Sequence, residues 1–191
     1  MSSIKGTRTE KNLLAAFAGE SQARNRYTYA AGVARKEGYL QIAELFQETA
    51  DNEREHAKRF FSFLEGGMAE ITASYPAGLT GTTADHLKAA AGGEHEEWTE
   101  LYPEFARVAK EEGFPQVAAA FTLISKVEKE HEDRYLKLLA NVQNNQVFAR
   151  AQPVRWKCRN CGHVHEGVEA PGKCPTCLHG REHFEIKAEN Y

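Results

Sequence analysis

A motif that occurs twice is the strongest constraint on the fold of this chain. EREH covers residues 53–56 and EKEH covers residues 128–131, each inside an amphipathic helical pattern. A glutamate and a histidine three residues apart lie on one helix face. Two unrelated helices would share an apolar stripe, but they would not share Glu, His and Tyr in one register, so we interpret the chain as a duplicated helical hairpin. The same offset in residue number relates Gly38 to Gly113, Tyr27 to Tyr102 and Phe46 to Phe121.

Hydrophobic periodicity and glycine breaks predict four helical stretches. The capping pattern Thr7-x-x-Glu10 predicts the start of the first stretch. Gly92, Gly93 and Pro103 predict a kink or local irregularity in the third. We expect the stretches to cover, in order, residues 7–36, 39–65, 83–112 and 114–141.

The sequence of residues 66–82 predicts a connection with little regular structure. Its length can span about 55 Å when extended, which exceeds the length of either flanking helix at about 1.5 Å per residue. The predicted fold class is therefore mainly α, a four-helix bundle with a long crossover between its second and third helices. We expect the bundle to cover residues 1–142, a polar linker to cover 143–153, and a small metal-stapled β domain to cover 154–191.

Further glutamates lie at the height of the two Glu-x-x-His motifs. Glu20 lies as far before the glycine break at Gly38 as His56 lies after it. Because each residue advances a helix by about 1.5 Å, the two side chains reach one level of an antiparallel hairpin. The second hairpin repeats this arrangement around its own glycine. The converging residues are Glu20, Glu53, His56, Glu94, Glu97, Glu128 and His131.

Buried carboxylates are unfavourable unless they are paired or bind a metal, so we expect these side chains to hold two metal ions. The pattern matches ferritin-like dimetal bundles, in which two helices each give a glutamate and two others each give Glu-x-x-His. Carboxylate and imidazole ligands favour iron or manganese, and the absence of thiolate argues against a structural zinc site.

Glu97 is surplus to that six-ligand pattern, and a spare carboxylate can let one metal change ligands as its oxidation state changes. Tyr27 and Tyr102, about two turns from Glu20 and Glu94, can donate hydrogen bonds to ligand carboxylates. Two alternatives stay open: Glu97 can lie beside the ligands or in solvent, and the tyrosines can be core aromatics. We expect four neighbouring side chains to be non-ligands: Glu55, His86, His95 and Glu96.

All four cysteines fall near the C-terminus with the spacing C-x2-C-x12-C-x2-C, at Cys158, Cys161, Cys174 and Cys177. In a cytoplasmic chain two such knuckles favour one tetrahedral metal over disulfides. Zinc and iron both accept four thiolates, and a redox-active bundle site that needs an electron source favours iron. Four histidines are surplus to this site, and we expect them on the surface or in packing: His163, His165, His179 and His183.

The composition excludes some classes of partner. A formal net charge of −3 gives no reason to expect binding to nucleic acid or to an anionic membrane surface. The sequence has no apolar run of about 18 residues, and its N-terminus lacks the apolar region of a signal peptide. We therefore expect a cytoplasmic protein.

Together these motifs resemble the rubrerythrin family over essentially the whole chain. A duplicated Glu and Glu-x-x-His bundle followed by a rubredoxin-like knuckle pair is a highly specific combination. The segments that carry the resemblance are RTEKNLLAAFAGESQARNRYTYAA, ETADNEREHAKRFFSFLEGG, AAAGGEHEEWTELYPEFARVAKEEGF, VEKEHEDRYLKLL, WKCRNCGHVHEG and KCPTCLHGREHFE.

The resemblance implies a ferritin-like domain with a non-haem di-iron centre, and a rubredoxin-like domain with one iron held by four thiolates. It also implies reduction of hydrogen peroxide to water, oxidative-stress protection, and electrons that arrive from rubredoxin or an NAD(P)H-linked reductase through the four-cysteine iron. In such proteins His56 would replace Glu97 at one iron on reduction. The implied assembly is a homodimer in which the tail of one subunit approaches the di-iron site of the other.

Two other functions compete with a peroxidase. A ferroxidase or iron-storage protein would use the same bundle site, but storage needs no electron-input domain. A scaffold with a zinc-ribbon tail would leave the duplicated inward-facing ligands unexplained.

Overall fold

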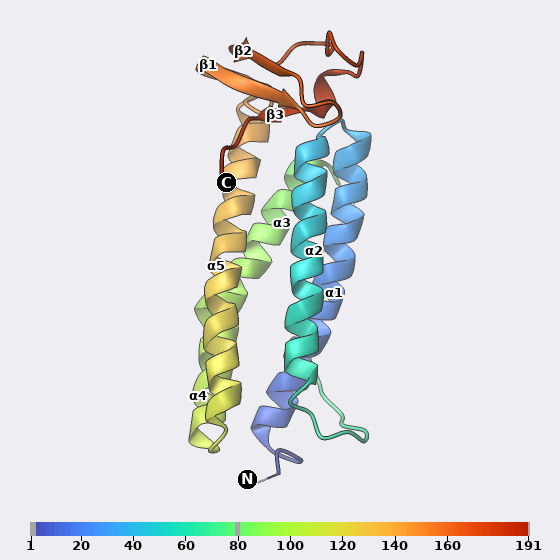
Figure 1. The fold of residues 1–191 in the computed structure, drawn as a ribbon. Helices are drawn as coiled ribbons and strands as arrows, with labels where there is room; N and C mark the ends of the chain where they lie inside the picture. The colour runs from blue at the N-terminus through green and yellow to red at the C-terminus, as the bar shows by residue number, and fades with distance from the viewer. Residues whose placement is uncertain (1–2, 79–80, 191) are drawn as a thin grey trace.

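The computed structural model describes residues 3–78 and 81–190, and helices dominate it. The first antiparallel hairpin consists of α1 (Arg8–Lys36) and α2 (Leu40–Phe61). The second pairs a composite helix with α5 (Pro115–Gln143). Figure 1 shows the two hairpins side by side, which is the predicted four-helix bundle. The composite helix consists of α3 (Thr83–Glu96), a π-helical stretch (Glu97–Leu101), here called the π segment, and α4 (Tyr102–Glu111).

The two hairpins turn in the same way. Gly38 and Gly113 have φ values of +81° and +84°, a left-handed conformation that glycine adopts without strain. After each glycine the next backbone N–H donates to a carbonyl five residues back, at 2.8 Å in both hairpins. The duplication seen in the sequence is therefore a duplication of backbone geometry.

Each hairpin turn also caps the first helix of the other hairpin. The carboxylate of Glu112 accepts the backbone N–H of Thr9 at 2.8 Å, and that of Glu37 accepts the N–H of Thr83 at 3.0 Å. Such a carboxylate satisfies an unpaired N–H and lies at the positive end of the helix dipole. These two reciprocal caps tie the hairpins into one bundle.

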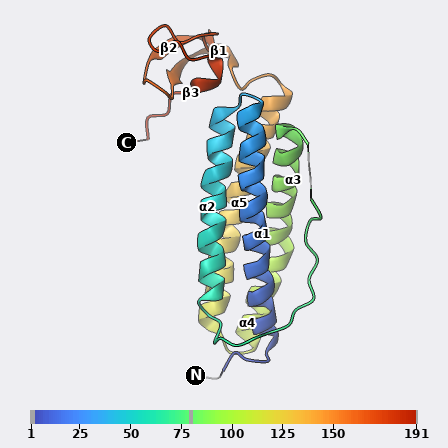
Figure 2. The ribbon, with the colours of Figure 1, turned by 90° about the vertical axis from the view of Figure 1, so that its right-hand side faces the viewer.

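The crossover between α2 and α3 has no regular structure in its described residues, as predicted, and two of its residues, 79 and 80, lie outside the described part. It runs along the outside of the bundle (Figure 2). The hydroxyl of Tyr75 donates to Ala15 O at 2.8 Å and holds the crossover against α1. Helix α2 ends at Phe61, four residues earlier than expected, and the expected capping box at Thr7 is half formed, since Glu10 accepts from Gly6 N–H instead.

The core has two apolar clusters along the bundle. One is centred on Phe46, Leu87 and Tyr135, and the other on Leu13, Phe60 and Phe121. Four glutamates and a histidine are buried in the same bundle, a large exception to the rule that ionisable groups stay exposed. These residues are Glu20, Glu53, Glu94, Glu128 and His131.

The tail forms a three-stranded antiparallel sheet in the order β2–β1–β3. Its strands are β1 (Ala149–Cys158), β2 (Val164–Glu169) and β3 (Phe184–Ile186). Strand β1 begins inside the segment expected to be a linker, because Ala149 already pairs with Glu169.

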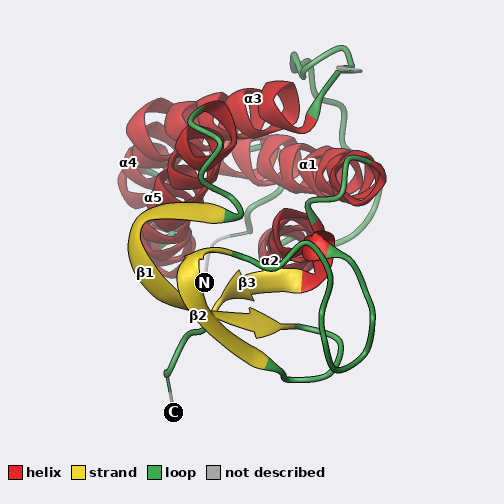
Figure 3. Ribbon diagram, turned by 90° about the horizontal axis from the view of Figure 1, so that it is seen from above, coloured by secondary structure: helices red, strands yellow, loops and turns green. Residues whose placement is uncertain are grey.

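The sheet lies at the end of the bundle at which α1 turns into α2 (Figure 1), and seen from above it leaves α1 and α3 uncovered (Figure 3). Tyr39 stacks on Phe148 with ring centroids 6.2 Å apart, and this contact joins the two parts. Within the described residues, the helices lack the combination of length and apolar character that crossing a membrane requires.

Candidate metal centres

The irregularity predicted in the third helical stretch is the π segment, and Glu97 is its first residue. The expected causes lie outside it, since Gly92 and Gly93 belong to regular α3 and Pro103 occupies the first turn of α4. The backbone N–H of Tyr102 donates to the carbonyl of Glu97, five residues back, which is the bonding of a π helix. A π turn holds one residue more than an α turn, so the residues on its two sides are rotated relative to one another compared with a regular α helix.

The sequence repeat records the additional residue, and a closer comparison of the two copies would have located it. The separation between the buried threonine and the buried glutamate is the same in both copies, but the glutamate and the tyrosine are one residue farther apart in the second copy. The insertion therefore lies between Glu94 and Tyr102, where the π segment lies. The compared residues are Thr9, Glu20 and Tyr27 in one copy, and Thr83, Glu94 and Tyr102 in the other.

Seven ligands were predicted, and the structure brings six of them together in two overlapping groups. Within each group the candidate ligand atoms lie within 4.8 Å of one another. Glu53 and Glu128 belong to both groups, so their carboxylates can bridge two metals. The first group is Glu20, Glu53, His56 and Glu128, and the second is Glu53, Glu94, Glu128 and His131.

The contacts of His131 suit a metal better than hydrogen bonds, whereas Nδ1 of His56 lies in hydrogen-bond geometry 2.9 Å from Glu53 Oε2. Nδ1 of His131 lies 2.8 Å from Glu128 Oε2 and 3.2 Å from Glu53 Oε1. These atoms nevertheless lack hydrogen-bond partners of proper geometry among the described residues. Lone pairs that converge without a shared proton fit a cation between them, and buried oxygens of Glu20 and Glu94 are unpaired as well.

The electrostatics of the site show the same need for positive charge. Burial, followed by repulsion from Glu53, raises the pKa of Glu94 to about 8. Burial also raises the pKa of Glu20 well above its ordinary value. Burial alone would lower the pKa of His131, but the carboxylates of Glu128 and Glu53 outweigh it and raise that pKa to about 12. Without a cation the cluster holds protons, which two metal ions would replace.

The two predicted tyrosines donate to ligand carboxylates. The hydroxyl of Tyr27 lies 2.6 Å from Glu94 Oε1, and that of Tyr102 lies 2.5 Å from Glu20 Oε1. Both phenols are buried. Each tyrosine therefore orients the glutamate contributed by the opposite hairpin. From the sequence alone, the two tyrosines could also have been core aromatics without this role.

Glu97, the seventh predicted ligand, belongs to neither group. It lines a cleft of about 820 Å³ formed by α1, the crossover and the composite helix. Burial and the neighbouring carboxylates, first that of Glu94, raise the pKa of Glu97 well above its ordinary value. His56 occupies a place in the first group instead, with Nδ1 at 2.9 Å from both Glu53 Oε2 and Glu128 Oε1.

The residues expected to be non-ligands lie outside both groups. Glu55 and Glu96 are exposed. His95 is turned away from the carboxylates and contacts Glu132 on α5. His86 lies near the start of α3 and lines a second cleft, beside Tyr27 and Tyr29.

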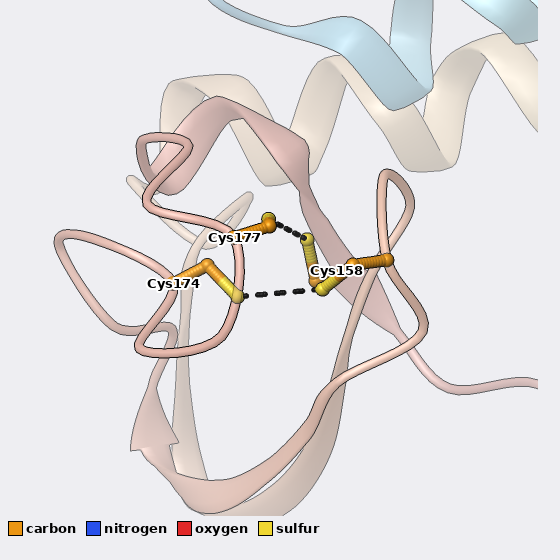
Figure 4. A group of neighbouring side chains, drawn as sticks. Cys158, Cys174 and Cys177 are labelled. Atoms are coloured by element: carbon orange, nitrogen blue, oxygen red, sulfur yellow. Dashed lines mark hydrogen bonds between the residues drawn. The ribbon is translucent and has the colours of Figure 1, made fainter.

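The four cysteines converge at the end of two matched knuckles. The sulfurs of Cys158 and Cys177 are 3.7 Å apart, and those of Cys161 and Cys174 are 3.6 Å apart. Four thiolates at about 2.3 Å from a tetrahedral metal would lie about 3.8 Å from one another, so the set fits one ion. Figure 4 shows the labelled cysteines pointing toward a common centre.

Backbone N–H groups support the two knuckles identically. Gly162 N–H donates to Cys158 O and Leu178 N–H to Cys174 O, each at 2.9 Å. Two of the four surplus histidines contact residues around the site: His163 contacts Thr176, and His179 contacts the carbonyl of Cys177.

Comparison with known proteins matches both parts of the chain. The Rubrerythrin family pattern matches residues 11–139, and the pattern described as "Rubrerythrin, rubredoxin-like domain" matches residues 156–185. A rubrerythrin of Porphyromonas gingivalis is 62% identical over 99% of this chain and 94% of its own length. One from Nitratidesulfovibrio vulgaris is 55% identical over the full length of both chains.

Solved structures show the same architecture. Nigerythrin in its fully reduced, all-ferrous state matches with a TM-score of 0.63 at 31% identity, over 97% of this chain and 92% of that chain. Symerythrin from Cyanophora paradoxa matches with a TM-score of 0.64 at 22% identity, over 75% of this chain and 89% of that chain, and this match concerns the fold alone.

Proposed function

The chain belongs to the rubrerythrin family, and from this premise we propose that it is a peroxidase that reduces hydrogen peroxide to water. Its cofactors are a non-haem di-iron centre with glutamate and histidine ligands and one iron in a rubredoxin-like site of four cysteines. The family is one of oxidoreductases. The observation that carries the peroxidase proposal is the relation between His56 and Glu97.

His56 and Glu97 are two alternative ligands for one metal position. His56 already lies in the first ligand group, whereas Glu97 lies outside it at the wall of the large cleft. A site that exchanges a neutral imidazole for an anionic carboxylate can adjust its charge when the metals gain or lose electrons. We propose that His56 binds in the reduced state and Glu97 in the oxidised state.

When bound, the iron pair would supply the two electrons needed to cleave the O–O bond, and the surrounding residues would hold the irons and supply protons. Glu53 and Glu128 belong to both ligand groups and would hold both metals, and the hydroxyls of Tyr27 and Tyr102 keep Glu94 and Glu20 oriented. The cleft gives a small peroxide a route to the centre. When Glu97 is not a ligand, its carboxyl group can hold a proton and pass it to an oxygen that leaves as water.

The position of the tail supports a homodimer. The four-cysteine domain lies beyond the turn between α1 and α2 (Figure 1). Glu20 lies near the middle of α1 and His56 in the last third of α2, both well away from that turn. The separation is about five helical turns, or about 27 Å of helix, and electron transfer weakens steeply with distance. We propose that the tail of one subunit reduces the di-iron site of a second copy, and that the tail receives electrons from rubredoxin or an NAD(P)H-linked reductase.

The test begins with metal analysis and a visible spectrum of the protein isolated without air. About three irons per chain are expected from the two ligand groups and the four cysteines. The reduced protein is then titrated with hydrogen peroxide, and stoichiometric reoxidation much faster than that by dioxygen supports a peroxidase. Faster reoxidation by dioxygen, with iron deposited as mineral, would identify a ferroxidase instead. A colourless zinc protein that is inert to peroxide would refute the proposal.

A further inference from the structure

Glu132 on α5 contacts both sides of the junction between α3 and the π segment. Its Oε2 accepts the indole N–H of Trp98 at 2.5 Å, and its Oε1 lies 3.0 Å from Nδ1 of His95. Only 14% of the Glu132 side chain is exposed. Glu97 lies between His95 and Trp98 in the chain, so one carboxylate contacts the side chains of a residue before it and a residue after it.

Two further side chains of α5 approach the same segment. The hydroxyl of Ser125 donates to Trp98 O at 3.3 Å, and Lys129 Nζ lies 5.9 Å from the centre of the indole ring. Ser125 and Glu132 are two helical turns apart, which places them on one face of the helix. A π turn is less favourable than an α turn and persists where other contacts stabilise it. Hydrogen bonds to an ionised carboxylate are among the strong ones.

The duplication provides an internal comparison. At the offset that relates the two copies, Ser125 and Glu132 correspond to Ala50 and Ala57 of α2. The helix that faces them, α1, is α-helical from Arg8 to Lys36. The hairpin with polar side chains at these positions has a π segment, and the hairpin with alanines at them has none in its described residues.

We propose that Glu132 is a positioning residue for Glu97. By holding His95 and Trp98 it keeps the π segment formed, and it thereby sets the place from which the Glu97 carboxylate reaches the metal pair. The proposal rests on the proposed function in one respect, namely that Glu97 is an exchangeable iron ligand.

The first test needs no metal. Hydrogen exchange of the metal-free full chain is compared between wild type, Glu132→Ala, Glu132→Gln and the control Glu130→Ala. Glu130 is an exposed glutamate of the same helix. We expect loss of protection at residues 97–102 in Glu132→Ala only, because the glutamine oxygen can still accept from Trp98. Equal protection in Glu132→Ala and Glu130→Ala would overturn the proposal.

The second test uses the iron-loaded protein. Glu132→Ala should change the visible spectrum of the oxidised di-iron centre, where Glu97 binds, more than that of the four-cysteine iron. Trp98→Phe removes the indole N–H and also reduces the size of the ring. It should change the spectrum in the same direction, which keeps the test valid if Glu132→Ala folds poorly. An unchanged spectrum in both variants contradicts the proposal. If wild type reacts with peroxide, an unchanged spectrum in the variants contradicts only the role of Glu132. If wild type is inert to peroxide, the proposed function itself fails.

Discussion

Nδ1 of His56 on α2 lies 2.9 Å from Oε1 of Glu128 on α5, so helices from the two hairpins meet at one metal position. A contact of this length between an imidazole and a carboxylate at the centre of a bundle requires either a shared proton or a metal. Burial alone would lower the pKa of His56, but the carboxylates of Glu128 and Glu53 raise it to about 10. The protein without metal therefore keeps a proton where the loaded protein has a cation.

The first prediction concerns Glu97. Replacing it with alanine should slow reoxidation by hydrogen peroxide about 100-fold, since the variant would lose both the proposed exchangeable ligand and the proposed proton donor. The melting temperature should change little, because Glu97 makes no ion pair among the described residues and lines an open cleft. Stopped-flow absorbance of the reduced protein measures the rate. Glu100→Ala, an exposed position in the same π segment, is the matched control, and equal rates in the two variants would remove the role of Glu97.

The second prediction is a pH dependence of the metal-free protein. The pKa of Glu94 rises from 4.5 to about 8 on folding, chiefly through burial, so the folded state binds a proton more tightly than the unfolded state. Stability from such a group is fully present below pH 4.5 and is lost as the pH rises through 8. Urea midpoints of the metal-free protein should therefore fall between about pH 5 and 9.

The contribution of Glu53 to stability has the opposite pH dependence, but it changes in a different pH range. Burial raises its pKa, and the imidazoles of His131 and His56 lower it overall to about 2. Its contribution is lost only in acid, as the pH falls below 4.5 toward 2. The iron-loaded protein should show the reverse trend between about pH 5 and 9, because iron binds deprotonated carboxylates. A flat profile for the metal-free protein would contradict the electrostatic description.

The third prediction uses the aromatic residues that flank the site in both hairpins. Tyr27 packs edge-on against Tyr135 at 5.4 Å, and Tyr102 packs edge-on against Phe60 at 5.5 Å. Tyr135 and Phe60 correspond between the two copies. The buried hydroxyl of Tyr135 lies near the side chain of Thr49, whose own hydroxyl donates to Leu45 O, but it has no partner of proper hydrogen-bond geometry among the described residues. Tyr135→Phe should therefore stabilise the protein by about 1 kcal/mol, because a buried unpaired hydroxyl is unfavourable.

The mirror substitution tests the same reasoning. Phe60→Tyr adds a hydroxyl to a fully buried ring and should destabilise by about 1–3 kcal/mol. Urea unfolding of the metal-free proteins measures both changes. If Tyr135→Phe proves clearly destabilising, the hydroxyl has a partner, such as a buried water, that the protein contacts do not reveal.

Much of the bundle was predictable because periodicity and duplication leave few arrangements open. The heights of Glu20, His56 and their counterparts follow from the helix rise, and the structure brings them together. The π segment was not predicted as such, because helical sequence patterns do not distinguish an inserted residue from a kink at Gly92 or Pro103. The missing signal was the spacing between the buried glutamate and tyrosine, which grows by one residue from the first copy to the second.

The tail was less predictable than the bundle. Cysteine spacing alone predicted the four-thiolate site. The start of β1 at Ala149 could not be read from the polar composition of residues 143–153, because the pairing partner Glu169 is distant in sequence. The roles of His95 and Glu132 were also missed. Their contact joins α3 to α5, and helical periodicity places side chains on faces without saying which residue of another helix they touch.

The last prediction compares the two cysteine knuckles. Gly162 follows the first knuckle with φ of +81°, and Leu178 follows the second with φ of +64°. The two positions make equivalent hydrogen bonds to Cys158 O and Cys174 O. A leucine side chain in the left-handed region is strained by about 1–2 kcal/mol. Because the side chain of Leu178 is largely exposed, little packing offsets that strain.

Leu178→Gly should therefore stabilise the iron-loaded tail by up to about 1 kcal/mol, since the added freedom of the unfolded glycine chain offsets part of the relieved strain. Gly162→Leu should destabilise it by a similar amount or more, because it introduces the same strain in the other knuckle. The rate at which a chelator bleaches the four-cysteine iron measures the stability of the tail, and the bundle serves as an internal reference through its helical circular dichroism. Bleaching that is faster in Leu178→Gly than in wild type would mean that the leucine side chain protects the metal, and that this protection outweighs its backbone strain.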